Sequence, residues 1–250
     1  MSMHTDPIRQ PEELKSYYQD QQVVRSYLQR RTTQPLNGLL HRRQVALLNE
    51  IVAATRPARV LELACGPGRL TAEVHGVRFG VAVDASLPML RLARERTRGA
   101  EWQFVRTDAF RLPFPSKTFD FVYSARFVRH FEIEHRQRLY AEILRVLAPR
   151  GMFLVDALNF ETSYPARVER GLDRYQIYDV LYRPGEAEQE LRAAGFRVIR
   201  TEGLLRHFPL QRRINRLRFR LGRVARWLIE ALEYVPGRQV QTWMILCQRE

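Results

Sequence analysis

The fold of this chain is decided by the stretch Val60-Leu61-Glu62-Leu63-Ala64-Cys65-Gly66-Pro67-Gly68-Arg69-Leu70-Thr71. Its first part is apolar, which is typical of a strand in a parallel sheet covered on both faces. Gly66 and Gly68 then allow a sharp turn, and they also allow the backbone to approach a ligand closely. We therefore expect a buried strand that carries an acidic residue, Glu62, and leads directly into a glycine-rich loop.

Two further acidic residues follow strand-like runs. The run Gly80-Val81-Ala82-Val83 leads into Asp84, and a third run leads into Asp108. In a doubly wound α/β fold, an acid at the end of the second strand binds the ribose of a nucleotide. One such acid is more often a helix cap or a solvated charge, but Glu62, Asp84 and Asp108 after three successive runs indicate a nucleoside site.

Charge distinguishes between the nucleoside cofactors that this site could bind. A dinucleotide would place its anionic pyrophosphate on the glycine turn, where Glu62 would repel it. The third glycine of the dinucleotide pattern is also missing, because Thr71 stands in its place. S-adenosylmethionine has no phosphate, and a carboxylate can stabilise its cationic sulfonium and ammonium groups. The sequence therefore favours S-adenosylmethionine over NAD.

From about residue 60 to residue 157 the chain resembles the class I S-adenosylmethionine-dependent methyltransferases, in particular the group that includes the ubiquinone and menaquinone C-methyltransferases. The resemblance is carried by four ordered blocks, which are 62–68, 83–86, 107–114 and 119–124 followed by 145–154. It implies an α/β fold with a Rossmann-like, doubly wound, seven-stranded sheet, whose last strand is antiparallel and lies beside the fifth.

The resemblance also implies which residues surround the methionine part of the cofactor. Glu62 would lie there together with the backbone of Ala64, Gly66 and Gly68, and Ser124 would lie nearby. Ala64 departs from the family pattern, which usually has a glycine at this position. Its side chain leaves less room for the turn.

For the adenosine part, the resemblance implies a second group of residues. Asp84, with Ala85 beside it, would accept hydrogen bonds from both ribose hydroxyls. Asp108 would accept one from the adenine amino group, while Ala109 and Met89 would lie against the ring.

Three residues are candidates for contact with the methyl acceptor. His130 follows the fourth predicted strand and is the candidate catalytic base, which a phenol or carbon acid would need but a neutral amine would not. The same histidine could instead cap the next helix or bond within its loop. Arg126 could bind an anionic substrate, and Tyr18 could close over the site or simply pack.

Arg42 and Arg43 could approach the cofactor carboxylate.

The length of 250 residues and the 45% hydrophobic content indicate a single globular domain. We expect an N-terminal helical lid at 1–56, a core at 57–203 and 238–250, and a helical insertion at 204–237. The two cysteines, Cys65 and Cys247, have neither metal-ligand spacing nor a disulfide framework, so we expect no metal and a cytoplasmic protein. No stretch is long and apolar enough to span a bilayer.

The hydrophobic patterns predict alternating helices and strands. Helices are expected near 12–30, 37–55, 68–75, 87–96, 134–147 and 186–194. Strands are expected near 58–63, 79–84, 101–107, 119–124, 151–157, 196–202 and 240–248.

The insertion is predicted to hold one basic amphipathic helix over 210–232. One face would carry apolar residues at steps of four and three, and arginines fill the positions between them. The apolar positions are Leu210, Ile214, Leu217, Leu221, Val224, Leu228 and Ala231. The formal net charge of +14 favours anionic partners.

Three interpretations of this helix remain open. It could pack over the sheet edge and cap the substrate mouth, with its arginines solvated. It could dock on an anionic membrane surface, such as the inner membrane, or on a lipid-like substrate. Contact with RNA phosphates is less favoured, because basic residues alone supply no element that reads bases. The sequence does not determine the oligomeric state, and a homo-oligomer is one of the states that it allows.

The sequence therefore favours a methyltransferase that acts on a small-molecule or lipid-like acceptor. An RNA methyltransferase is an alternative, although neither an Asn-Pro-Pro-Tyr motif nor a Pro-Cys nucleophile is present. A non-catalytic S-adenosylmethionine-binding accessory protein is a further alternative, because intact cofactor motifs do not prove turnover.

Overall fold

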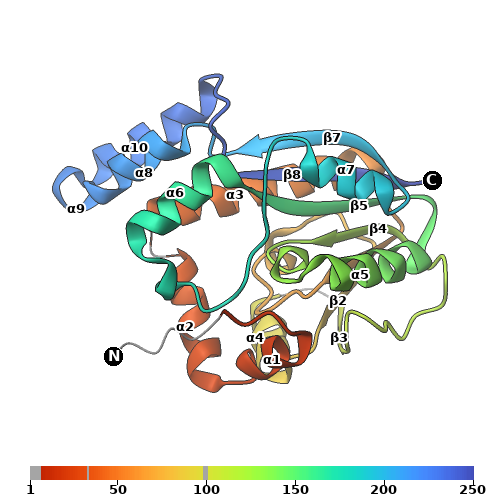
Figure 1. The fold of residues 1–250 in the computed structure, drawn as a ribbon. Coiled ribbons are helices and arrows are strands. Elements are labelled where there is room, and N and C mark those ends of the chain that lie inside the picture. Colours follow the sequence, from red (N-terminus) through yellow and green to blue (C-terminus); the bar gives the residue numbers. More distant parts are fainter. Residues whose placement is uncertain (1–6, 33, 98–100) are drawn as a thin grey trace.

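One mixed β-sheet organises the structure, a computed structural model that describes residues 7–32, 34–97 and 101–250. The strand order is β3-β2-β1-β4-β5-β8-β7, and the short β6 pairs with β5 outside this path (Figure 1). The strands are β1 (Arg59–Leu63), β2 (Phe79–Asp84), β3 (Trp102–Arg106), β4 (Phe119–Ser124), β5 (Leu147–Asn159), β6 (Leu181–Tyr182), β7 (Phe196–Leu204) and β8 (Thr242–Arg249).

Strand directions confirm the predicted Rossmann-like sheet. The strands β1 to β5 pair in parallel, and β8 runs antiparallel to both β5 and β7. The predicted place of the last strand, beside the fifth, is therefore correct. The sheet has an eighth strand, β6, which the sequence did not predict because it is only 2 residues long. The strand order reverses between β1 and β4, where open α/β sheets bind their ligands.

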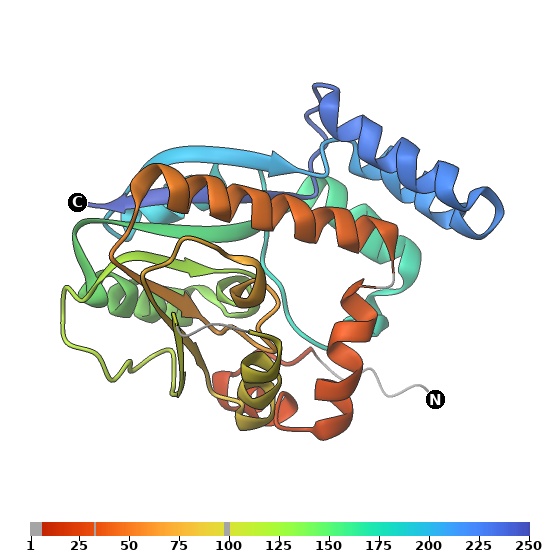
Figure 2. The same cartoon turned by 180° about the vertical axis from the view of Figure 1, so that it is seen from behind.

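Helices cover both faces of the sheet, as Figures 1 and 2 show from opposite sides. Leu61 and Leu63 of β1 share a core with the helices α5 and α7, whereas Val60 belongs to the core under α3 and α4. The helices are α1 (Pro11–Tyr17), α2 (Gln21–Thr32), α3 (Pro35–Thr55), α4 (Leu87–Arg96), α5 (Ile133–Val146), α6 (Phe160–Arg170), α7 (Glu186–Ala193), α8 (Phe208–Arg216), α9 (Arg218–Leu221) and α10 (Arg223–Ala231).

Two predicted helices in the N-terminal half need correction. The predicted helix at 12–30 is two helices, because Asp20 accepts hydrogen bonds from the backbone N–H groups of Gln22 and Val23 and so starts α2. The predicted helix at 68–75 is only the 3-10 turn Thr71–Glu73. It ends at Val74, whose φ of −88° and ψ of 123° are those of extended backbone. Helix α6 was not predicted.

The predicted single helix over 210–232 is also wrong. The chain leaves helical geometry at Leu217, and at Gly222 it adopts a φ of 51° with a ψ of −121°, which strongly favours glycine. Residues 208–231 therefore form three shorter helices, and α8 and α10 lie side by side. We call this segment the hairpin. It projects away from the sheet (Figures 1 and 2).

Within the described ranges, no helix combines the length and the apolar character that a membrane span requires.

Candidate cofactor and acceptor site

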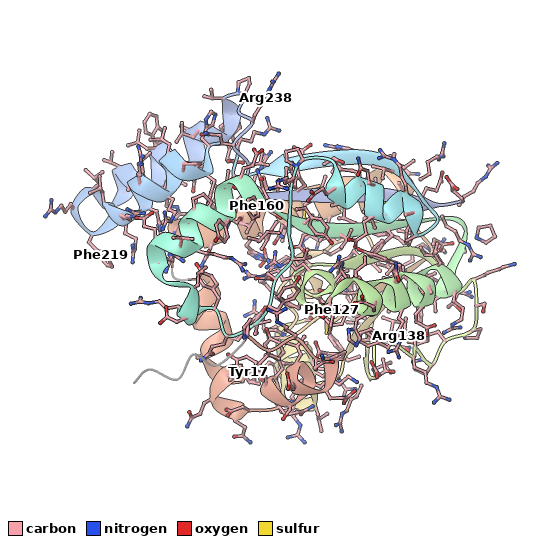
Figure 3. The ribbon with its side chains drawn as sticks, viewed as in Figure 1. Tyr17, Phe127, Arg138, Phe160, Phe219 and Arg238 are labelled. Carbon is pink, nitrogen blue, oxygen red and sulfur yellow. The ribbon has the colours of Figure 1, made fainter. Side chains whose placement is uncertain are left out.

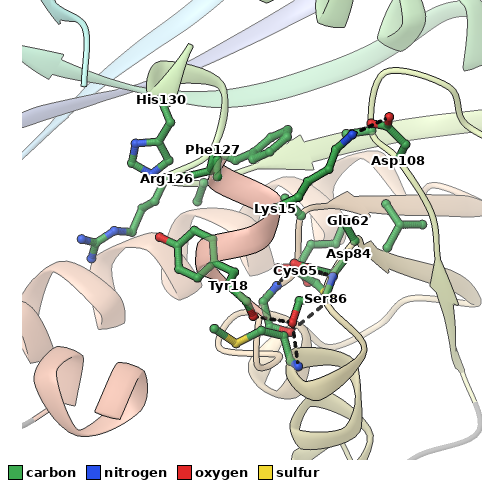
Figure 4. Close-up of a pocket in the computed structure, with 18 of the residues that line it drawn as sticks. Lys15, Tyr18, Glu62, Cys65, Asp84, Ser86, Asp108, Arg126, Phe127 and His130 are labelled. Carbon is green, nitrogen blue, oxygen red and sulfur yellow. Dashed lines mark hydrogen bonds and ion pairs between the residues drawn. The ribbon is translucent and has the colours of Figure 1, made fainter. Parts of the chain in front are cut away.

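A pocket lies at the carboxyl ends of β1, β2 and β4, next to the reversal in strand order (Figure 4). It brings together residues from distant parts of the chain. The predicted site residues that line it are Tyr18, Glu62, Ala64, Gly66, Asp84, Ala85, Met89, Asp108, Ala109, Arg126 and His130. We call this pocket the cofactor chamber.

Two of the predicted cofactor residues do not line this chamber. Gly68 faces helix α4, where a Cβ atom built on it would lie 2.9 Å from the Cα of Ala93. Ser124 is buried, and its hydroxyl donates to the carbonyl of Leu63 at 3.1 Å. Gly68 therefore lets the loop pack closely on α4, and Ser124 ties β4 to β1.

Glu62 lies in β1 with only 4% of its surface exposed. Its Oε2 atom accepts hydrogen bonds from the hydroxyl of Thr71 and, at 2.8 Å, from the hydroxyl of Tyr123. Burial raises the pKa of Glu62 to about 7, although these two hydrogen bonds and Arg69 oppose the shift. A cation bound beside Glu62 would favour its ionised form. From the sequence, Thr71 was notable only because it stands where the dinucleotide pattern has a glycine. Its hydrogen bond to Glu62 was not predicted.

Asp84 fixes the glycine-rich loop against the end of β2. Its Oδ2 atom accepts from the backbone N–H of Gly66 and its Oδ1 from that of Ser86, both at 2.8 Å. Burial raises the pKa of Asp84, and these backbone hydrogen bonds oppose that shift. Each carboxylate oxygen keeps a second lone pair. Asp84 can therefore still accept hydrogen bonds from two vicinal hydroxyls.

The N-terminal helix α1 covers the chamber, and three polar contacts hold the helix and the two residues that follow it. Lys15 Nζ lies 2.8 Å from Asp108 Oδ2, the hydroxyl of Ser86 donates to the Tyr18 carbonyl at 2.7 Å, and the Gln19 amide donates to the Ala85 carbonyl at 3.0 Å. Two of these partners, Asp108 and Ala85, are predicted cofactor residues. The lid and the predicted adenosine site are therefore directly coupled. Lys15 was not identified from the sequence.

Among the described residues, Arg69 and Arg126 are the arginines that line the cofactor chamber, and neither Arg42 nor Arg43 lines it. Arg69 Nη1 lies 2.7 Å from His41 Nδ1. Arg42 pairs instead with Glu230 at 2.5 Å. Arg43 points to Glu202 and Glu233, at 3.9 Å from each. Arg42 and Arg43 thus pair with carboxylates outside the cofactor chamber, so these pairs do not support their approach to the cofactor carboxylate.

A second cavity of about 370 Å³ adjoins the first. We call it the acceptor chamber. Tyr18, Arg126 and His130 are the three residues that line both chambers, and Figure 4 shows them on one side of the cofactor chamber. The acceptor chamber is rich in arginine, with Arg126, Arg129, Arg167, Arg170, Arg174 and Arg212 among its lining residues. Its arginines favour a ligand that carries negative charge.

His130 is buried between the chambers, and only its Nδ1 atom has described partners. Nδ1 lies 3.0 Å from the carbonyl oxygen of Tyr178 and 2.9 Å from Asp179 Oδ1. In the neutral ring, these acceptors place the proton on Nδ1, so Nε2 carries the lone pair. The ring thus bonds to a distant segment of the chain and not within its own loop, and this leaves a basic nitrogen on a ring that lines both chambers.

A buried ion-pair network supports this arrangement. Asp179 pairs with Arg129 at 2.9 Å and with Arg167 at 2.5 Å, and Arg129 also pairs with Asp156 at 2.5 Å. Burial opposes ionisation of Asp179, but Arg129, His130 and Arg167 lower the pKa of Asp179 below its ordinary value. Asp179 is therefore ionised and fixed in position. This network was not predicted from the sequence.

Arg126 differs from these paired arginines. Its backbone N–H donates to Asp156 Oδ1 at 2.6 Å, and its φ of 64° lies in the left-handed region. Its Nε is buried, and the described part of the chain offers this atom no hydrogen-bond partner. Such a donor is costly to leave unpaired. Arg126 can therefore donate to an anionic ligand at the junction of the two chambers.

The described residues include no cluster of three or more His, Cys, Asp or Glu side chains that could hold a metal ion. Cys65 and Cys247 are both buried free thiols.

A comparison with protein families finds that residues 60–151 match a model described as a methyltransferase domain. Residues 60–151 of this chain therefore form a methyltransferase domain. The match lies within the stretch for which the sequence predicted this family, and S-adenosylmethionine is the cofactor of the domain class.

Curated relatives of the methyltransferase domain include quinone methyltransferases. The chain is 38% identical over 104 residues to a demethylmenaquinone methyltransferase from Thermus thermophilus, which covers 40% of this chain and 46% of the relative. It is 32% identical over 150 residues to a ubiquinone/menaquinone biosynthesis C-methyltransferase from Stutzerimonas stutzeri, with 57% of each chain covered. The chain thus spans about half the length of these relatives.

Solved structures share the fold of the methyltransferase domain over most of the chain. Magnesium protoporphyrin IX methyltransferase from Synechocystis, solved with bound SAH, aligns at a TM-score of 0.65 and 14% identity, covering 96% of this chain and all of the other. A possible histamine N-methyltransferase from Thermotoga maritima aligns at 0.59 and 18% identity, covering 92% and 97%. Both likenesses show the fold.

Proposed function

We propose that this chain transfers a methyl group from S-adenosylmethionine to a small-molecule or lipid-like acceptor that carries an anionic group. One observation carries the proposal. A chamber with three acidic residues meets a chamber rich in arginine, and Tyr18, Arg126 and His130 lie at the junction. A cationic donor and an anionic acceptor would be held on opposite sides of that junction.

The cofactor chamber fits the donor through its three carboxylates, although Lys15, Arg69 and Arg126 also line it. Glu62 is buried with a pKa raised to about 7, and a neighbouring sulfonium or ammonium group would offset that cost of burial. Asp84 has lone pairs for two ribose hydroxyls, and Asp108 is the predicted acceptor for the adenine amino group. S-adenosylmethionine supplies a methyl carbon that its sulfonium already activates.

The arginines of the acceptor chamber favour an acceptor that carries an anionic group. Arg126 has an unpaired buried Nε, and Arg170 and Arg174 also line the chamber. A carboxylate or phosphate on the acceptor would pair with these guanidinium groups. The names of the curated relatives point to quinones, which supports the lipid-like part of the proposal but not the anionic group.

The residues at the junction then have separate roles in the transfer. The helix α1 lid limits water at the reacting centre, and Arg126 orients the acceptor for in-line attack. His130 accepts the acceptor's proton at Nε2 where the acceptor is a phenol or carbon acid. Asp179 is a positioning residue, since it holds the Nδ1 side of the ring.

The experiment is transfer of tritiated methyl groups from S-adenosylmethionine into cell extract, followed by fractionation into lipid, small-molecule, nucleic-acid and protein pools. We expect label in lipids or small molecules that bind an anion-exchange resin. Label in RNA would replace the proposal with an RNA methyltransferase. Intact binding of S-adenosylhomocysteine with no label in any pool would indicate a non-catalytic binding protein.

A further inference from the structure

The hairpin, residues 208–231, is fixed to the body of the protein by its inner side. Gln211 is fully buried, and its amide donates to the Ile229 carbonyl at 3.1 Å and to Glu233 at 2.8 Å. Phe208 and Ile229 form a small core together with residues of α3. These contacts hold the inner side of the hairpin against the body of the protein. The opposite side packs on no other element of the part of the chain that the structure describes.

The outer side of the hairpin exposes large apolar residues. Phe219 is 85% exposed, Trp227 66% and Val224 56%, and Leu210, Leu217 and Leu221 are also exposed. Figure 3 shows Phe219 at the free end of the hairpin, away from the sheet. Four positions of the predicted apolar face, Leu210, Leu217, Leu221 and Val224, therefore lie in solvent. A cluster of this kind marks an interaction surface.

The same side is strongly basic. The hairpin contains seven arginines and one acidic residue, Glu230. Arg212 and Arg216 pair with Glu169, and Arg226 pairs with Glu230. Arg213, Arg220 and Arg223 are exposed, and no carboxylate of the described residues pairs with them. These three arginines lie close in sequence to the exposed Leu217, Phe219 and Val224.

We propose that the outer side of the hairpin docks on a lipid bilayer that contains anionic headgroups. Such an interface accepts both parts of the surface, since phosphates pair with the arginines and the acyl boundary takes Phe219, Val224 and Trp227. A second copy of this chain would place its own arginines against those of the first, and these like charges would repel each other. A nucleic acid would pair with the arginines but would leave Val224 and the leucines in water.

The hairpin that docks there also contributes to the acceptor chamber through its inner side. Phe208 and Arg212 of α8 line that chamber, and Arg212 also reaches Glu169 of α6. The docked hairpin therefore lies beside the chamber in which we expect the methyl acceptor. The docking itself is independent of the proposed reaction, so vesicle binding tests it without reference to turnover.

The experiment is co-sedimentation of the full chain with phosphatidylcholine vesicles that contain about one third phosphatidylglycerol. We expect binding that weakens as salt is raised, because added ions screen exposed charges. Arg220→Glu combined with Arg223→Glu should reduce partitioning by about tenfold or more. Phe219→Ser combined with Trp227→Ser should have an effect of similar size through lost apolar insertion.

Matched controls use exposed residues elsewhere on the protein. Arg91→Glu on α4 changes an exposed arginine, and Ile199→Ser on β7 changes an apolar residue that is 48% exposed. Both controls should bind vesicles as the unchanged protein does. Unchanged S-adenosylhomocysteine binding by every variant would show that each is folded. Equal vesicle binding by the hairpin variants and the controls would overturn the proposal.

Tryptophan fluorescence gives an independent readout. Trp102 is buried and Trp243 is partly buried, whereas Trp227 is exposed. Addition of anionic vesicles should therefore shift the emission to the blue in the unchanged protein, and Trp227→Phe should bind yet lose that shift. No shift on vesicle addition, or tight binding to tRNA with none to vesicles, would assign the surface to a different partner.

Discussion

The hydroxyl of Tyr123 donates a 2.8 Å hydrogen bond to Glu62 across the neighbouring strands β4 and β1. The two residues are partners in the parallel register, although 61 positions separate them in the chain. This pairing holds a buried carboxylate at the point where the strand order reverses. Because the pKa of Glu62 is raised to about 7, we expect a cation that binds beside it to displace a proton, and this proton release can be measured.

Affinity for S-adenosylmethionine should rise with pH. Because burial raises the pKa of Glu62 to about 7, the free protein is mostly protonated there below that pH, whereas a cation favours the ionised form. Between pH 6 and pH 8 we expect the Kd to tighten by about tenfold. Calorimetry in two buffers of different ionisation enthalpy should detect proton release near pH 7. Glu62→Gln should remove the dependence, and a pH-independent Kd in the unchanged protein would contradict this role.

Asp84→Ala should weaken S-adenosylhomocysteine binding by about 10- to 100-fold, because two hydrogen bonds to a carboxylate are lost. The matched control is Asp120→Ala. Asp120 accepts from the backbone N–H of Arg59 at 2.9 Å, as expected of a residue that serves the fold rather than the site. The control should lower stability but keep the Kd. An unchanged Kd in Asp84→Ala would reject the ribose assignment.

Lys15→Met should tighten S-adenosylhomocysteine binding by a few fold. Lys15 pairs with Asp108 Oδ2 at 2.8 Å and so competes with the adenine amino group for that carboxylate. A partly exposed ion pair contributes at most about 1 kcal/mol, which sets the size of the effect. Lys15→Arg keeps the charge and serves as the control. Weaker binding by Lys15→Met would mean that the pair holds the lid closed over the ligand.

His130→Gln should reduce kcat by about 100-fold or more on a phenol or carbon acid, while the Kd for S-adenosylmethionine is retained. Arg126→Gln should instead raise the acceptor KM and leave kcat largely intact, because that side chain is proposed to bind and not to react. The two variants together separate proton transfer from positioning. Near-normal turnover in His130→Gln would remove that residue from the mechanism.

Gly68→Ala should lower the free energy of unfolding by about 2 kcal/mol or more. The added Cβ would meet the Ala93 backbone at 2.9 Å, and the φ of 69° is unfavourable for alanine. Gly66→Ala is the control, since it has a φ of 55° but no atom within 4 Å of the added Cβ, so it should cost only about 1 kcal/mol. Urea denaturation measures both. An equal loss of unfolding free energy in the two variants would show that the close packing of Gly68 on α4 does not contribute to stability.

The sequence alone determined the sheet and its acidic strand ends. The predicted bounds of β2, β4 and α4 agree with the structure, because hydrophobic periodicity and breakers act within a few residues. Local sequence signals predicted the wrong structure where a continuous apolar repeat and residues that break a helix occurred in the same segment. Gly222 and Leu217 broke a helix whose apolar spacing was otherwise continuous.

Only the tertiary structure decided how the site is completed. Thr71 and Tyr123 reach Glu62, Lys15 reaches Asp108, and Asp179 reaches His130. Three of these four contacts join residues that lie far apart in the chain, and strand order and lid position bring them together. The acceptor chamber likewise exists only after α3, α6 and α8 have packed around it. Local spacing cannot encode such contacts, because they depend on which elements become neighbours in the folded sheet.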